Sequence, residues 1–128
     1  MDRLTDSKEL ALFAAQTAIE NNALEPVLLQ ASDITSYTDF ILVISGQSMR
    51  QVEALAEQVR LALKQHDRDP IGREGERGGH WVLLDYGDLV IHVLHHPARE
   101  YYDLEGLWSD ATRVELQVPP ELRVASLF

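Results

Sequence analysis

Two aspartates and three histidines lie within twelve residues of one another, at Asp85, Asp88, His92, His95 and His96. Carboxylates and imidazoles are the usual ligands of divalent cations, so this group suggests a metal site. Its spacing does not support one: His92 and His96 lie on an expected strand and at its end, where their side chains need not converge, and no HExxH helix or HxH pair is present. We expect no metal and no cofactor, with His92 partly buried and hydrogen-bonded and with His95 and His96 solvated.

Other enzymatic chemistry has little support in this sequence. The glycine-rich stretch Gly72–Gly79 lacks the lysine and the Ser or Thr of a phosphate-binding P-loop, and Glu74 and Glu76 would repel phosphate. No serine lies in a nucleophile-elbow context, and the absence of cysteine excludes thiolate catalysis and disulfides. We therefore predict that the chain is not an enzyme. A metal-dependent enzyme that uses Asp85, Asp88 and His92 remains the alternative.

The stretch Trp81–Asp110 combines acidic and aromatic residues. It holds six Asp and Glu but a single basic residue, Arg99, together with both tryptophans and three of the four tyrosines. Acidic groups among exposed aromatics suit the recognition of a basic protein, although the aromatics could instead belong to the core, as we expect for Trp108. The partner-binding residues that we predict are Trp81, Asp85, Tyr86, Asp88 and Tyr102.

Charge and hydropathy narrow the class of partner. The 128 residues include 21 Asp and Glu against 11 Lys and Arg, a formal net charge of −10 without a basic cluster. Nucleic-acid binders normally carry a basic face, so we expect little or no direct contact with nucleic acid. Such a charge favours a basic protein partner, or only keeps the chain soluble. No apolar run is long enough to cross a membrane and no signal peptide is recognisable, so we expect a cytoplasmic protein without a membrane partner.

The elements of the N-terminal half follow from caps and apolar periodicity. A helix is predicted to begin after Asp6, whose side chain and Glu9 form a capping pattern, and to end near Asn21. Strands are expected at Val27–Leu29 and at Phe40–Ile44, the second buried on both faces because every position is apolar. A second helix with an apolar stripe should span Met49–His66.

The C-terminal half predicts a β-hairpin and a last helix. A short strand is expected at Pro70–Ile71 and a flexible loop at Gly72–Gly79. Trp81–Leu84 and Leu89–Leu94 flank a short turn as a hairpin, and Pro97 should open a helix that reaches Trp108. After a possible edge strand at Val114–Val118, the last residues should pack weakly or not at all. The prediction is an α/β (α+β) fold with a single mixed sheet of about five strands flanked by helices, in the order α-β-β-α-β-β-β-α.

Five segments, in order, resemble the ribosomal silencing factor family, also called Iojap-related proteins. The longest is WVLLDYGDLVIHV at 81–93. The others are ITSYTDF at 34–40, SGQSMRQV at 45–52, GREG at 72–75 and REYYDLEGLW at 99–108. One departure is Gln51, where a histidine is common in the family. The resemblance predicts a family domain at residues 1–110 and a C-terminal extension at 111–128.

Several functional expectations follow from the resemblance alone. It implies a translational repressor that binds a basic large-subunit protein at the intersubunit face and keeps the small subunit from joining. Large-subunit biogenesis is a related role of organelle members. The family fold is similar to that of nucleotidyltransferases, but Gly46–Ser48 is not followed by the Asp-x-Asp pair that those enzymes use for Mg²⁺. An adaptor for a non-ribosomal protein is a further alternative, and a homodimer is a possible state of the free protein.

Overall fold

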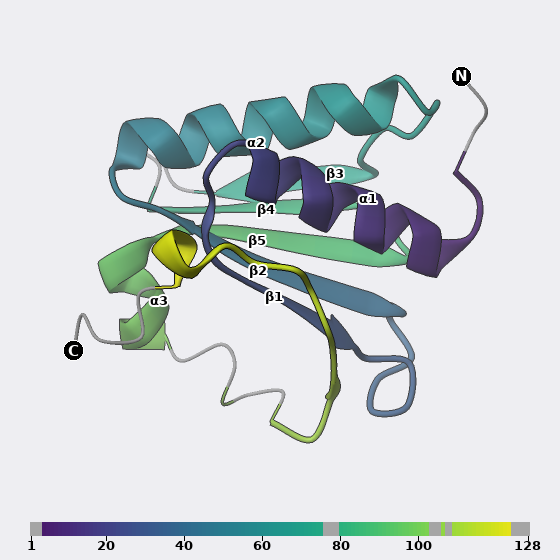
Figure 1. Cartoon of the computed structure of the whole chain (residues 1–128). Coiled ribbons are helices and arrows are strands. Elements are labelled where there is room, and N and C mark those ends of the chain that lie inside the picture. Colours follow the sequence, from purple (N-terminus) through teal and green to yellow (C-terminus); the bar gives the residue numbers. More distant parts are fainter. Residues whose placement is uncertain (1–3, 76–79, 103–105, 107–108, 124–128) are drawn as a thin grey trace.

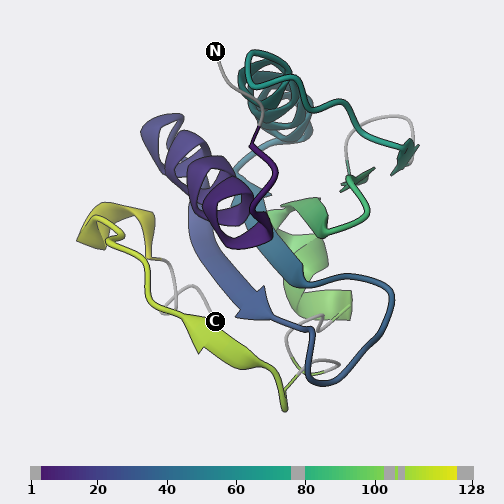
Figure 2. The same cartoon turned by 90° about the vertical axis from the view of Figure 1, so that its right-hand side faces the viewer.

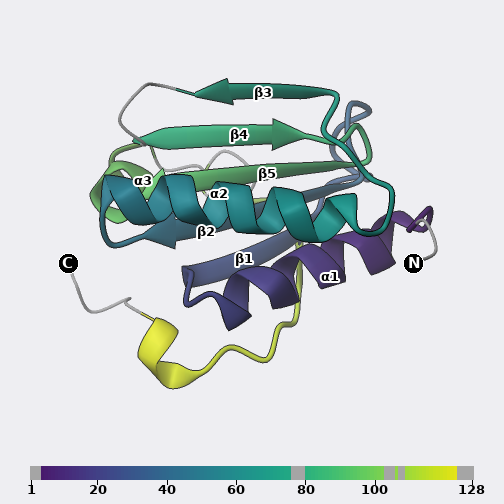
Figure 3. The same ribbon diagram turned by 90° about the horizontal axis from the view of Figure 1, so that it is seen from above.

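The computed structural model describes residues 4–75, 80–102, 106 and 109–123, with residues 100–102 described as backbone. Within these residues, six strands form one mixed sheet in the order β3-β4-β5-β2-β1-β6. Helices α1 and α2 lie side by side over one face of this sheet, and α3 lies on the other side, at the end where β5 finishes (Figures 1 and 3). The fold is the mixed α/β arrangement predicted from the sequence, with one more strand than the expected five or so.

Helix α1 spans Ser7–Glu20 and begins at the predicted cap. The Asp6 carboxylate accepts hydrogen bonds from the backbone N–H groups of Lys8 and Glu9, which would otherwise lack partners in the first turn. The helix buries an alanine-rich stripe and ends at Asn21. Small side chains let α1 lie close to the sheet.

Helix α2 spans Met49–Lys64, so it ends slightly before the expected His66. The Ser48 hydroxyl caps it by accepting from the backbone N–H of Gln51 at 3.1 Å. Its buried residues recur with helical spacing and cover the same face of the sheet as α1: Val52, Leu55, Ala56, Val59 and Leu63.

The central strands are buried on both faces, as the continuous apolar sequence indicates. Strand β2 (Phe40–Gly46) pairs in parallel with β5 (Leu89–His95) and antiparallel with β1 (Leu24–Gln30). Strand β4 (Trp81–Asp85) pairs antiparallel with β5, which confirms the predicted hairpin. The hairpin thereby fixes which residues of β4 point toward α1 and α2 and which point away from them.

Two predicted strands at the edges of the sheet have the wrong bounds. Strand β3 spans Gly72–Gly75 and pairs antiparallel with β4. The strand therefore begins after the expected Pro70–Ile71 and occupies the start of the loop expected at Gly72–Gly79. Strand β6 spans Thr112–Val114, starting earlier than expected, and pairs antiparallel with β1. An edge strand is held by backbone hydrogen bonds to a single neighbour, so it needs no apolar alternation to form.

The described part of the C-terminal segment packs on the fold instead of trailing from it. Figure 2 shows this segment running beside β1, and it continues into the 3₁₀ helix η1 at Pro120–Leu122. Leu122 is buried in a cluster with Ile19 and Leu24. The expectation of a weakly packed tail after Pro119 and Pro120 is therefore wrong for Leu122.

Helix α3 spans His96–Tyr102, one residue earlier than predicted from Pro97. Its expected continuation to Trp108 includes residues outside those that the structure describes. Within the described residues, no helix is long and apolar enough to cross a membrane.

Candidate partner-binding surface

The alternation of β4 divides the predicted contact residues between two faces of the sheet. Val82, Leu84 and Tyr86 are buried in the core beneath α1 and α2. Trp81, Leu83 and Asp85 are half-buried and belong to the opposite face, as strand geometry requires. Only part of the predicted set can therefore form a single surface.

Trp81 lies on the face that α1 and α2 leave uncovered. Its indole packs against an apolar cluster of β1, β2 and β5, and its N–H donates to Nδ1 of His92 at 3.0 Å. The two rings are tilted by 46° with centroids 5.7 Å apart. Trp81 is thus half-buried: its indole contacts the sheet and His92, and the side chain is not fully exposed.

Asp85 shapes the turn that follows β4. Its Oδ1 accepts from the backbone N–H of Gly87 at 2.8 Å, and Gly87 has φ of 85°, a conformation that L side chains rarely adopt. Burial, followed by the charge of Asp85, raises the pKa of the Tyr37 phenol. The loop before β2 therefore brings Tyr37 near this carboxylate.

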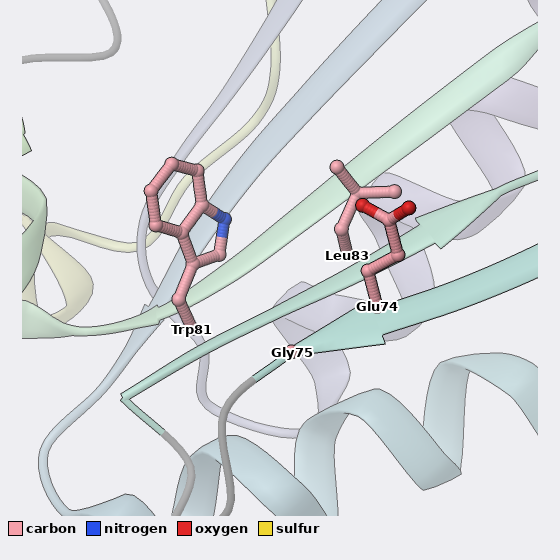
Figure 4. A pocket seen from close by; sticks show the side chains of 4 residues that line it. All are labelled: Glu74, Gly75, Trp81 and Leu83. Carbon is pink, nitrogen blue, oxygen red and sulfur yellow. The ribbon is translucent and has the colours of Figure 1, made fainter.

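Two neighbouring pockets lie on this face. One, of about 360 Å³, is lined by Glu74, Gly75, Trp81 and Leu83. Figure 4 shows the side chains of Trp81 and Leu83 from β4 and Glu74 from β3 rising from the same side of the two strands. The other, of about 200 Å³, shares Glu74 and Leu83 and adds Tyr37, Gly72, Asp85, Val90 and His92.

We call five residues of this face the acidic-aromatic patch: Tyr37, Glu74, Trp81, Leu83 and Asp85. Trp81 and Asp85 were predicted from the sequence. Tyr37, Glu74 and Leu83 were not predicted. Tyr37 lies in a loop, and Glu74 lies on a strand that was not expected there. Leu83 was expected only as one residue of an apolar strand. The patch offers apolar rings and two carboxylates, which is chemistry for binding a partner.

Tyr86 does not belong to the patch, so its prediction as an exposed contact residue is wrong. It is 4% exposed and lies in the helix-side core. Burial raises its pKa to about 12. The physical reason is that the alternation of β4 continues past Asp85, while the Tyr86 N–H bonds Leu89 O to close the turn.

Asp88 is also absent from the patch, because it holds Arg68 in place. Its Oδ1 accepts from the Arg68 guanidinium at 2.6 Å, and the Arg68 side chain is only 9% exposed. The same guanidinium donates to the carbonyl oxygens of Leu4 and Tyr86. Asp88 thus helps to join the N-terminal segment, the loop after α2 and the β4–β5 turn. The remaining predicted residue, Tyr102, ends α3, and its side chain lies outside the described residues.

The histidines follow the sequence predictions in part. His92 is hydrogen-bonded, as predicted, but at 5% exposed it is more deeply buried than the partial burial expected. His96 was expected to be solvated but is 7% exposed, because α3 begins directly after β5 and stays close to the sheet. His95 is half-buried, with Nε2 3.2 Å from Gln47 O. No group of three metal-ligating side chains occurs among the described residues, and Asp85, Asp88 and His92 have the separate partners given above.

A pH-dependent loss of stability is expected from His92. Burial lowers its pKa from 6.5 to about 4. The His92 imidazole is mostly neutral in both the folded and the unfolded protein above pH 6.5. As the pH falls toward 4, the unfolded chain binds a proton at this imidazole and the folded protein does not, so stability is lost in this window. At about 1.4 kcal/mol per pH unit, the loss is about 3 kcal/mol.

Urea unfolding at pH 7 and pH 4 tests this expectation. His92→Asn should lose about 3 kcal/mol less between the two pH values than the parent protein, whereas His80→Asn, a change at an exposed histidine, should lose as much as the parent. Equal losses in His92→Asn and the parent would show that His92 does not titrate in this way.

The chain is similar to known proteins over most of its length. A family model described as "Ribosomal silencing factor during starvation" matches residues 4–126. A ribosomal silencing factor of Chromobacterium violaceum is 39% identical over 101 residues, covering 79% of this chain and 83% of the relative. One from Halalkalibacterium halodurans is 36% identical over 111 residues, covering 87% and 95%. A crystal structure of a Chromobacterium violaceum protein is similar with a TM-score of 0.79 and 35% identity, covering 90% of this chain and 95% of that one.

Proposed function

Because the chain belongs to the ribosomal silencing factor family, we propose that it is a cytoplasmic translational repressor. It binds the large ribosomal subunit and blocks the association of that subunit with the small subunit. The contact on the large subunit is a basic protein at the intersubunit face. A role in large-subunit biogenesis is compatible with the same binding site. The chain acts by binding alone and carries out no catalysis.

The composition of the acidic-aromatic patch supports this partner chemistry most directly. Glu74 and Asp85 supply negative charge beside the apolar surfaces of Trp81 and Leu83. Aromatic side chains frequently anchor protein interfaces, and opposite charge steers a partner to them. A formal net charge of −10 extends that steering over the whole molecule.

The proposed mechanism is steric. A domain of this length has a radius of gyration of about 13–15 Å, and the sheet gives the patch a rigid support. When the patch is bound to the large subunit, the layer of α1 and α2 on the opposite face projects away from the contact (Figure 1). The bound domain therefore occupies volume that the small subunit needs in order to dock.

Sedimentation with purified ribosomal particles tests the proposal. The protein should travel with isolated large subunits and not with isolated small subunits or with joined ribosomes. Sedimentation with none of these particles would overturn ribosome binding and leave the adaptor alternative. Equal binding to joined ribosomes would overturn the steric block, because the bound site would then be accessible in the presence of the small subunit.

Binding to the large subunit is expected to weaken strongly with salt. The reason is that the charges of Glu74 and Asp85 act across a partly solvated contact, and the Debye length falls from about 10 Å at 0.1 M to about 4 Å near 0.5 M. A titration of labelled protein with large subunits at both salt concentrations measures the change. Asp85→Asn should show a shallower dependence than the parent. An affinity that does not change with salt would contradict the basic-partner chemistry.

A further inference from the structure

We propose that His92 is a positioning residue for partner binding: by accepting the N–H of Trp81, it holds the indole in the orientation from which the indole contacts the partner. The inference rests on the proposed function, because it assigns a task within the same patch. Trp81 would touch the partner, whereas the buried His92 would act only through Trp81.

The register of the hairpin brings the two rings together. In the antiparallel pair, Leu83 lies opposite His92 and Trp81 lies opposite Leu94, so Trp81 and His92 are diagonal neighbours on one face. Their hydrogen bond of 3.0 Å and their tilted rings are the result. A one-residue shift of either strand would move one ring to the helix side and break this contact.

The hydrogen bond defines the chemical state of both partners. The indole N–H can only donate, so Nδ1 of His92 must carry a free lone pair to accept it. The imidazole is then neutral with its proton on Nε2. The donor and acceptor directions of two planar rings restrict the indole far more than apolar contact alone would.

The difference in burial between the two residues suggests which one positions the other. His92 is 5% exposed and lies in the middle of β5, between Leu83 of β4 and Val43 of β2. Trp81 is the first residue of β4, is half-buried and lines the larger pocket. A rigid buried acceptor can therefore fix a more accessible donor. Ordering that donor before binding avoids an entropic cost on association.

Two variants of His92 separate positioning from simple packing. His92→Leu removes the acceptor while keeping a buried apolar side chain, and His92→Asn keeps an acceptor oxygen at about the place of Nδ1. The indole N–H resonance of Trp81, assigned by its loss in Trp81→Phe, reports the hydrogen bond directly. His92→Leu should shift this resonance and weaken binding to large subunits about three- to tenfold. His92→Asn should bind within about twofold of the parent.

Trp81→Phe supplies an independent variant in case His92→Leu does not fold. It removes only the donor and keeps an aromatic ring, so it should weaken binding to about the same degree. Where His92→Leu and Trp81→Phe both fold, the double variant should bind large subunits no more weakly than either single variant, because the same hydrogen bond is lost in all three.

Several outcomes would overturn the inference. They are an unshifted indole resonance in folded His92→Leu, parent-like affinity of His92→Leu or Trp81→Phe, and an equal loss of affinity in His92→Asn and His92→Leu. Failure of the proposed function gives a different result: the parent protein itself would then not sediment with large subunits, even though His92→Leu still shifts the indole resonance.

Discussion

Asp88→Lys is expected to lower the free energy of unfolding by roughly 2–4 kcal/mol. The change removes the carboxylate that pairs with Arg68 at 2.6 Å and puts a second cation beside a guanidinium that is 9% exposed. Breaking a fully buried ion pair from one side costs about 3–5 kcal/mol, and the lower range applies here because the Asp88 side chain is 24% exposed. Urea or guanidinium unfolding measures the loss.

Asp33→Lys is the matched control for this charge change. Asp33 is exposed, so its replacement alters the net charge equally without touching Arg68, and its effect should stay within about 0.5 kcal/mol. Asp88→Asn should fall between the two, because it keeps an acceptor but loses the charge. If Asp88→Lys is as stable as Asp33→Lys, the Arg68–Asp88 pair does not hold the β4–β5 turn in the way described.

Trp81→Ala is expected to weaken binding to the large subunit by about thirtyfold, or about 2 kcal/mol, because truncation removes the largest aromatic surface of the acidic-aromatic patch. Its cost in stability should be roughly 1–2 kcal/mol, below the 3–5 kcal/mol typical of a core tryptophan, since the side chain is only half-buried. Affinity and thermal unfolding should be measured on the same preparation.

Leu61→Ala gives a control on the opposite side of the molecule. Leu61 is 47% exposed on α2, so its loss removes exposed apolar surface far from the patch. It should leave the affinity for the large subunit unchanged. A larger loss of affinity in Leu61→Ala than in Trp81→Ala would show that the contact surface lies on the layer of α1 and α2.

The sequence predicted those elements whose signals are local. Asp6 and Ser48 mark the starts of α1 and α2 because each side chain satisfies backbone donors of the next few residues. The run Phe40–Ile44 predicted a strand buried on both faces because neither side of β2 meets water. The predicted bounds of β3 and β6 were wrong because an edge strand is held by backbone hydrogen bonds to one neighbour, which leave no apolar pattern in the sequence. For β6, that neighbour also lies far away in the sequence.

The candidate surface was predicted only in part for a similar reason. Trp81 and Asp85 share a face because Asp85 lies an even number of positions after Trp81 along β4, whereas Tyr86 lies at an odd offset and falls on the other face. Asp88 could not be assigned without Arg68, whose position depends on where α2 ends and how the chain returns to the sheet. Nearness in the sequence predicted a cluster, but strand alternation and long-range pairing determine the surface.

The association of purified subunits, followed by light scattering, tests the central claim most directly. The parent protein and Leu61→Ala, added to large subunits before small subunits, should suppress the scattering increase that accompanies joining. Trp81→Ala should suppress it only at a concentration about thirtyfold higher. A folded Trp81→Ala protein that blocks joining at the same concentration as the parent would contradict the assignment of the acidic-aromatic patch as the contact surface.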